Sequence, residues 1–277
     1  MARAIWSGSI SFGLVNVPVK LHAAVRRKDV HFHQLDEKSG ARIRNRRVSE
    51  TSGREVPNER IVKGYEFEKG AYVPVTDEEL EAVEPERTHT IDVEDFVSLH
   101  DVDPLQYVNT YWVAPDGAKG APKAYALLRD AMDRTDRVAI ARFVLRTKEH
   151  LVMLRPVDNA LALHTMLYPD EIVASSDVDG LPVRVKADAR ELKMASQLVE
   201  SLTVEWDPKR YKDTYRERLL DVIKRKAKGE EIVTEPQHEK SADVVDLMAA
   251  LEASIEASKQ RGGRSKTKSR SRARKSA

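Results

Sequence analysis

Apolar and polar residues alternate along much of the first two thirds of the chain, in the pattern typical of β-strands. The clearest run covers residues 15–25, where every second side chain is apolar: Val15, Val17, Val19, Leu21, Ala23 and Val25. The positions between them hold Asn16, Pro18, Lys20, His22 and Ala24. This period of two predicts a strand with one buried face. Because Pro18 has no N–H to donate, it indicates an edge strand or the beginning of a strand.

Three later segments are predicted to be strands for the same reason. Residues 29–35 continue the alternation, residues 137–157 form two strands joined by a turn near residues 147–150, and residues 159–169 form another strand. Strands and helices do not alternate regularly along the chain. Several short strands separated by turn signals therefore favour a barrel or a sandwich.

Helical periods appear in two places. Within the β-rich region, Thr76 and Glu79 have the spacing of a capping box that begins a short helix, and a second helix is predicted over residues 122–135. Both are expected to lie on the outside of the barrel. From Asp188 onward the apolar residues form two helical stripes, Leu192, Ala195, Leu198, Val199 and Leu202, then Tyr211, Tyr215, Leu219, Val222 and Ile223. These stripes predict that the last third of the chain is helical.

A third amphipathic helix is predicted beyond a polar linker at residues 229–240. Ser241 is its expected cap, the helix covers residues 241–258, and its apolar side chains are Val244, Val245, Leu247, Met248, Leu251 and Ile255. Because no neighbouring segment of the sequence could bury this stripe, the helix is expected to fold back or to bind a partner.

Composition narrows the classes of protein that these elements could form. The 277 residues are 41% apolar, which is enough for a core, and no run of eighteen apolar residues or signal-like N-terminus is present. We therefore expect a cytoplasmic protein. The absence of cysteine excludes disulfides, thiolate catalysis and cysteine zinc sites.

Positive charge is concentrated at the C-terminus. Residues 259–277 carry nine cations and no anion, whereas residues 1–258 have a formal charge of −7. A tail without large apolar residues is expected to be disordered, and such a tail binds polyanions such as nucleic acid or merely improves solubility. Its candidate DNA-binding residues are Arg261, Arg264, Lys266, Lys268, Arg270, Arg272, Arg274 and Lys275.

A second group of cations lies within residues 40–64. It consists of Arg42, Arg44, Arg46, Arg47, Arg54, Arg60 and Lys63. Arg42, Arg44 and Arg46 would share one face of an extended strand. Each guanidinium group can bind two oxygens of one phosphate through two N–H groups. Taken alone, such a cluster is also typical of a solvated surface.

Motifs of catalysis and metal binding are largely missing. The sequence has no phosphate-binding glycine loop, dinucleotide fingerprint, zinc-protease helix or nucleophile elbow. His31 and His33 could share a strand face, but no further ligand lies nearby. We therefore expect a protein without catalytic activity, cofactor or metal.

Five segments together resemble bacterial Ku, the DNA-end-binding family of non-homologous end joining. They are "ARAIWSGSISFGLVNVPVKL", "YEFEKGAYVPVTDEEL", "FVSLHDVDPLQYVNTYWVAP", "ALLRDAMDRTDRVAIARFVLRTKEHLVMLRP" and "LALHTMLYPDEI". The resemblance covers residues 2–258 in order. It implies a mixed, mainly β fold, with a Ku-type barrel core over residues 1–187, a bridge arm over about 36–70, and a helical segment over 188–228 that packs on the core or the dimer.

The resemblance also implies a function and partners. Ku is a homodimer whose two bridges close a ring around double-stranded DNA, so the cations of residues 42–63 would line the hole, with Lys20, Arg142 and Arg146 as further candidates. Residues 241–258 are the candidate contact for DNA ligase D, and the tail would touch DNA outside the ring, in the cytoplasm at the nucleoid. The alternative is a general DNA- or RNA-binding or DNA-compacting protein that acts through its tail.

One position departs from part of the family. Some relatives carry Cys-x-x-Cys in the bridge, where this chain has Ser49 and Ser52. Since serine is a poor zinc ligand, we expect the bridge to be held by packing and by its partner chain.

Overall fold

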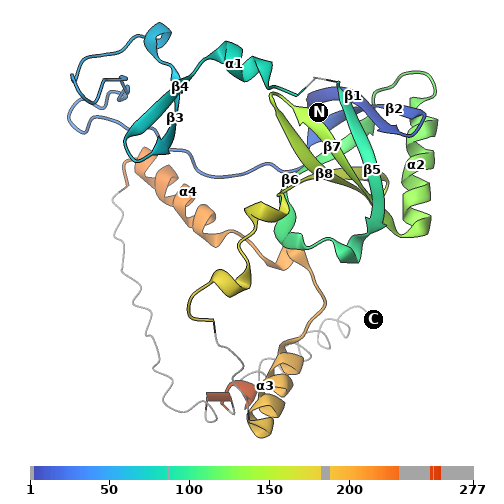
Figure 1. Cartoon of the computed structure of the whole chain (residues 1–277). Coiled ribbons are helices and arrows are strands. Elements are labelled where there is room, and N and C mark those ends of the chain that lie inside the picture. Colours follow the sequence, from blue (N-terminus) through green and yellow to red (C-terminus); the bar gives the residue numbers. More distant parts are fainter. Residues whose placement is uncertain (1–2, 86–87, 182–187, 231–249, 252, 257–277) are drawn as a thin grey trace. The chain divides into compact units, whose positions relative to one another are not determined.

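The computed structural model describes residues 3–85, 88–181, 188–230, 250–251 and 253–256 (Figure 1). The chain divides into two compact units, Met1–Val178 and Asp179–Ala277. Unit 1 contains a closed barrel and the long arm that is inserted between two of its strands. Unit 2 contains helices.

The barrel is closed by seven strands in the order β1-β2-β6-β9-β8-β7-β5. Neighbouring strands are antiparallel except β1 and β5, whose parallel pairing closes the barrel. Closure satisfies the edges that an open sheet would expose. The strand bounds are β1 Ala4–Phe12, β2 Val15–Ala23, β5 Thr90–Ser98, β6 Tyr107–Pro115, β7 Arg137–Leu145, β8 Lys148–Val157 and β9 Ala160–Met166.

Strand β2 buries every second residue from Val17 to Leu21, as its sequence pattern predicts. Val17, Val19 and Leu21 are completely buried in the barrel core, while the residues between them are partly exposed. The edge position predicted from Pro18 is wrong, because β2 lies between β1 and β6. Proline is tolerated because the β2–β6 pairing begins only at Val19. The Pro18 carbonyl accepts a hydrogen bond from the Asp116 N–H, just beyond β6, so the missing donor falls at the end of the ladder.

Of the three other segments predicted to form strands, two do so and one does not. Residues 137–157 form β7 and β8, joined by a two-residue turn at Arg146 and Thr147, and residues 159–169 contain β9. The strand predicted over residues 29–35 is wrong: this segment has no regular structure, and Leu35 makes only an isolated bridge to Arg42. Phe32 is 68% exposed, since no second layer covers the alternating side chains here.

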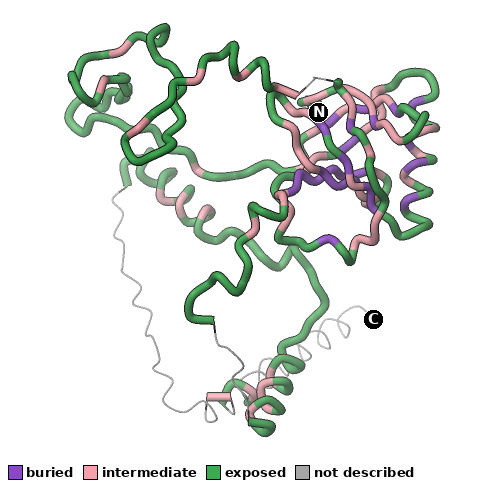
Figure 2. The backbone as a smooth tube through the Cα atoms, in the orientation of Figure 1, coloured by how far each residue is buried: buried purple, intermediate pink, exposed green. Residues whose placement is uncertain are grey.

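Buried residues gather on the barrel strands and on α2 (Figure 2), and their side chains form the core. Side chains from every strand meet there, and the largest completely buried ones include Ile10, Leu21, Ile91, Leu154 and Leu163. Burying a side chain of this size contributes roughly 1.5–3 kcal/mol. The contributing strands lie far apart in the sequence, so the barrel is stabilised by long-range pairing.

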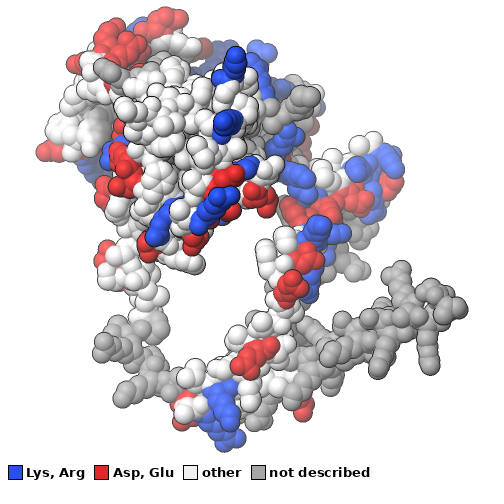
Figure 3. Space-filling view, turned by 90° about the vertical axis from the view of Figure 1, so that its right-hand side faces the viewer, with Lys and Arg blue, Asp and Glu red and all other residues white. Residues whose placement is uncertain are grey.

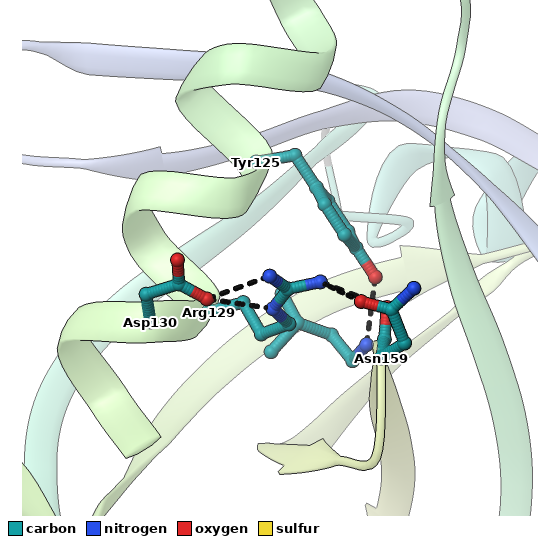
Figure 4. A network of polar contacts seen from close by, with 5 residues as sticks. Tyr125, Arg129, Asp130 and Asn159 are labelled. Carbon is teal, nitrogen blue, oxygen red and sulfur yellow. Dashed lines mark hydrogen bonds and ion pairs between the residues drawn. The ribbon is translucent and has the colours of Figure 1, made fainter. Parts of the chain in front are cut away.

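Helix α2, Ala121–Thr135, packs against β2, β6, β7 and β8 of the barrel. Its buried residues Ala121, Tyr125, Leu128 and Met132 repeat with a helical period. Figure 4 shows how polar groups fix this helix. The Tyr125 hydroxyl donates to the Val113 carbonyl and accepts from the Leu161 N–H, both at 2.7 Å.

The Arg129 guanidinium adds a second attachment (Figure 4). It donates to the Asn159 side-chain oxygen at 2.6 Å and to the Asn159 carbonyl at 3.0 Å. Its other edge contacts Asp130 at 2.7 Å. Burial raises the pKa of Tyr125 above 10.0, so its hydroxyl stays protonated and keeps its donor role.

A second buried polar cluster surrounds His164 on β9. Arg155 Nε donates to His164 Nε2 at 3.0 Å, so the neutral ring carries its proton on Nδ1 and donates to Thr110 Oγ1 at 3.0 Å. The Tyr107 ring stacks on the imidazole at 5.2 Å between centroids. Burial, with a smaller effect of the Arg155 charge, lowers the pKa of His164 below its ordinary value of 6.5.

This lowered pKa predicts that acid destabilises the barrel. Between the folded-state pKa of His164 and 6.5 the unfolded chain binds more protons, so the free energy of unfolding falls as the pH drops below about 6.5 and is fully retained above it. Urea unfolding at pH 7.5 and 5.5 measures this fall. His164→Gln should reduce it, whereas the exposed control His100→Gln should not. An equal fall in all three proteins would contradict the assignment.

The arm between β2 and β5 contains a two-stranded antiparallel sheet, β3 Lys63–Glu68 and β4 Ala71–Val75, followed by α1 Asp77–Ala82. The predicted capping box is confirmed: Glu79 N–H donates to Thr76 Oγ1, and the Thr76 N–H donates back to the Glu79 carboxylate. Unlike α2, helix α1 buries no residue. A two-stranded sheet of this kind is only marginally stable by itself.

Unit 2 contains α3 Ala189–Leu202 and α4 Thr214–Ala227, which confirms the two predicted helical stripes except at Tyr211, which lies before α4. Neither helix buries a residue completely, and Leu192, Val199 and Leu202 of the predicted stripe are more than half exposed. Between the helices, Trp206 stacks on Tyr211 at 5.2 Å. The short 3-10 helices of the chain are Asn58–Arg60, Leu99–Asp101, Pro104–Gln106, Pro169–Glu171, Ser175–Asp177 and Pro208–Arg210.

The predicted third helix lies mostly outside the described residues. Within it, residues 250–251 and 253–256 are helical, with Leu251 and Ile255 half-buried. Val244, Val245, Leu247 and Met248 fall outside the description, as do the linker beyond residue 230 and the whole basic tail. None of the described helices is both long and apolar enough to span a membrane.

Candidate nucleic-acid interface

Two hairpin turns of the same construction hold the first part of the arm. In each turn a backbone N–H donates to the carbonyl five residues later, Asp36 to Ala41 and Ser49 to Arg54, both at 2.9 Å. A glycine N–H donates back to the carbonyl of the first residue at 2.8 Å in both turns. These glycines, Gly40 and Gly53, have φ of 67° and 63°, where side chains other than glycine are strained.

Side chains close the two turns in the same way. The Ser39 N–H donates to the Asp36 carboxylate at 3.2 Å, and the Ser52 N–H donates to Ser49 Oγ at 3.4 Å. The hydrogen bond from the Ser39 hydroxyl is the main reason why the pKa of Asp36 lies below 3.8. Each turn is thus held by its own hydrogen bonds.

The turns change where the arginines point. The prediction that Arg42, Arg44 and Arg46 share one face of a strand is wrong, because residues 41–47 form no strand and only Arg42 takes part in an isolated bridge. The arginines instead lie on the stems of the two turns and on the chain between them. Their surroundings consequently differ from one residue to the next.

Four of the predicted arm cations have partners. Arg42 contacts His33 Nδ1 at 3.0 Å, and Arg46 forms an ion pair with Glu55 at 3.1 Å. Arg47 donates to Asn58 Oδ1 at 3.0 Å, and Lys63 pairs with Asp77 at 3.0 Å. All four contacts are at the surface, where an ion pair contributes about 0–1 kcal/mol, so phosphate could replace these partners.

Arg44, Arg54 and Arg60 have no side-chain hydrogen bond or ion pair with any residue that the structure describes, and all three are exposed. Their guanidinium groups are available to an anion without the loss of an existing partner. They are therefore the strongest candidates for phosphate contacts in the arm. The sequence pattern did not separate them from their neighbours.

The three candidate DNA-binding residues on the barrel differ in their surroundings. Arg142 on β7 lies between two carboxylates, Glu149 at 3.2 Å and Glu94 at 2.8 Å. The hydrogen bond with Glu149 and the charge of Glu94 raise the pKa of Arg142, so the guanidinium stays charged and the carboxylates compensate that charge. Lys20 donates to the Asp116 carbonyl at 3.3 Å. Arg146, in the β7–β8 turn, is exposed at a φ of 64°. Of the three, Arg146 is the best placed for an anion.

Metal binding finds no support in the described residues. They contain no group of three or more His, Cys, Asp and Glu that could hold a metal ion. His33 is engaged with Arg42, and Ser49 and Ser52 close a turn.

The repeated turn is a feature that sequence reasoning missed. Its signal is "DEKSG" at residues 36–40 and "SETSG" at residues 49–53, which place Ser and Gly at the same two positions thirteen residues apart. The shared hydrogen bonds show that this short similarity has structural meaning.

A closed seven-stranded barrel interrupted by a cation-bearing arm defines a distinct class of β-barrel protein. Comparison with known proteins identifies this class. Residues 11–194 match the family described as the Ku70/Ku80 beta-barrel domain. The chain is 49% identical to a protein of Anaeromyxobacter sp. (strain K) over 95% of this chain and 88% of that one. Proteins of Heliobacterium modesticaldum and Pseudomonas aeruginosa are 46% and 41% identical over 92% and 96% of this chain and 92% of each relative.

All three relatives are named non-homologous end joining protein Ku. The chain belongs to the Ku family.

Proposed function

We propose that the protein binds ends of double-stranded DNA without sequence preference, as a ring-shaped homodimer, in the repair of double-strand breaks by non-homologous end joining. The observation that carries this proposal is the family match over residues 11–194, which includes the whole arm with its exposed arginines. The relatives of this chain are named for non-homologous end joining, which supports a role in that repair process. The proposed role is non-catalytic.

The physical basis of end binding is the closed ring. Cations that contact phosphate bind any sequence, because the backbone of the duplex is the same throughout. A closed ring can be loaded only where the duplex ends. Two-fold symmetry of the homodimer suits the pseudo-symmetric backbone of the duplex. Specificity for ends thus comes from topology, and the arm cations supply affinity.

A second proposed partner is DNA ligase D, recruited through residues 241–258. The support is the amphipathic pattern of this segment together with the helical conformation of its described part, residues 250–251 and 253–256. The basic tail is proposed as an additional DNA contact, and the cytoplasm at the nucleoid as the place of action.

Competition between linear and circular DNA tests the proposal. The full chain should bind a labelled linear duplex of about 40 base pairs, and a hundredfold excess of closed circular DNA should displace little of it. The same plasmid after cutting should compete in proportion to its ends. Equal competition by cut and uncut plasmid would contradict end binding.

The alternative is general binding of nucleic acid through the tail, and it is favoured by the concentration of nine cations in residues 259–277. A chain that ends at residue 258 separates the two functions in the same assay. If the ring is responsible, the truncated chain retains its preference for ends; if the tail is responsible, binding is lost.

A further inference from the structure

Helix α2 has a second apolar stripe that the barrel covers only in part: Ala124 packs against the core, whereas Leu127 and Ala131 are exposed. Its first stripe, Tyr125, Leu128 and Met132, packs into the core. The second stripe consists of Ala124, Leu127 and Ala131, which repeat at the spacing of a helix face beside the first. Leu127 is 71% exposed. Nothing in the proposed contact with DNA requires an apolar flank here.

This stripe forms one wall of a groove on unit 1. The opposite wall comes from Phe12 at the end of β1, Val15 at the beginning of β2 and Phe96 on β5. The groove has a volume of about 590 Å³, within the usual range for binding pockets. Figure 3 views the side of unit 1 that carries α2 and shows a wide area with few charged side chains, bordered by charged ones.

The walls are exposed as well as apolar. Val15 and Phe96 are 44% and 46% exposed, and neighbouring Leu14 projects fully into solvent. Val15, Phe96 and Leu127 line the same groove. Contiguous exposed patches of this kind mark binding sites more often than isolated apolar residues do.

One cation lines this groove. Arg137, at the beginning of β7, is exposed, and the described residues provide it with no ion pair or side-chain hydrogen bond. Arg129 on the same helix differs, since Asp130 and Asn159 hold it in place. The end of the groove near Thr135 and Arg137 therefore offers a free guanidinium next to apolar walls, which is complementary to a carboxylate on an apolar partner.

We propose that this groove binds an amphipathic helix of another protein, which inserts its apolar residues between α2 and the β1–β2 turn and places a carboxylate against Arg137. From Ala124 to Thr135 the α2 flank is about 16 Å long. It can therefore accommodate three successive anchors on a partner helix at positions i, i+4 and i+7, which span about 10 Å. The site goes beyond DNA-end binding and uses none of the arm cations.

Synthetic peptides test the proposal on the full chain. The probes are fluorescent fifteen-residue helical peptides with three leucines at this spacing and glutamate at either the first or the last position, and matched peptides with lysine instead. A glutamate peptide should bind with a micromolar Kd in fluorescence anisotropy, and its lysine counterpart at least ten times more weakly. Leu127→Glu should raise the Kd of the glutamate peptide at least tenfold, whereas Leu105→Glu, an exposed leucine outside the groove, should not change it.

Charge reversal provides the sharper test. Arg137→Glu should weaken binding of the glutamate peptide and strengthen binding of the lysine peptide, by about tenfold each. Ala131→Tyr, which fills the groove from an exposed position, should abolish binding of both while DNA-end binding remains.

Three results would overturn the proposal. One is unchanged peptide affinity in Leu127→Glu and Ala131→Tyr, and another is an equal response of both peptides to Arg137→Glu. The third is a change of native mass in Leu127→Glu, which would show that a second copy of the chain occupies the groove. Loss of end binding in the arm variants would leave these outcomes unaffected, so the two proposals fail separately.

Discussion

Replacing Arg44, Arg54 and Arg60 together by glutamate is expected to abolish binding of the full chain to linear duplex DNA. These residues have no side-chain partner among the described residues, so each substitution removes a potential phosphate contact and adds repulsion. In the proposed homodimer both copies would carry the substitutions, which would double the loss of binding free energy. We expect the Kd, measured by gel shift or anisotropy at fixed salt, to rise by about a hundredfold or more.

A matched control separates the arm from overall charge. Lys119→Glu, Lys123→Glu and Arg134→Glu change the net charge by the same amount at exposed positions on or just before α2. This control should bind DNA within about threefold of the unchanged protein, since long-range electrostatics are screened at physiological salt. Native mass should be the same in all three proteins. Strong DNA binding by the arm variant would place the phosphate contacts elsewhere.

Gly8→Ala is expected to destabilise the barrel by about 2–4 kcal/mol. A Cβ at this position of β1 would overlap the His89 carbonyl oxygen and the Trp6 indole ring. Neither neighbour can move freely. The His89 carbonyl accepts from the Ser9 N–H at 3.0 Å where β1 meets β5, and Trp6 packs edge-on against Phe143.

Thermal unfolding measures this effect, and Gly8→Ala should lower the Tm by roughly 5–15 °C. Gly64→Ala is the matched control, because its new Cβ would approach no atom closer than 3.6 Å and its φ is ordinary. That substitution should leave the Tm nearly unchanged. If the two alanine variants unfolded at the same temperature, the close approach of β1 to His89 would not be a real constraint.

The sequence pattern predicted β2, β7, β8 and β9 of the barrel but not β1, β5 and β6, and it predicted a strand over residues 29–35 where none forms. Residues 15–25 alternate throughout, and residues 29–35 alternate through Val30 and Phe32. Only the first segment contains a strand, because β1 and β6 flank it and α2 packs on it. Period two shows that a segment could bury one face, but another element must supply the surface that buries it.

The sequence likewise identified the candidate DNA-binding cations only as a group. Composition identified residues 42–63 as rich in cations, and the resemblance to Ku assigned them to DNA. Neither separated Arg44, Arg54 and Arg60 from Arg46, which is paired with Glu55, nor Arg146 from Arg142, which lies between Glu94 and Glu149. These differences depend on partners seven to nearly fifty residues away along the chain, and only folding brings such partners together.

The sequence alone determined the family, the helices α1 to α4 with the capping box of α1, and the periods of four of the seven barrel strands. These properties depend on local spacing and on order along the chain, both of which can be read without coordinates. Tertiary structure decided which cations in the described part of the chain lack a side-chain partner, that β1 pairs with β5 to close the barrel, and that α2 leaves an apolar flank open beside Arg137. Each of these depends on contacts between distant residues, whose energies no local pattern records.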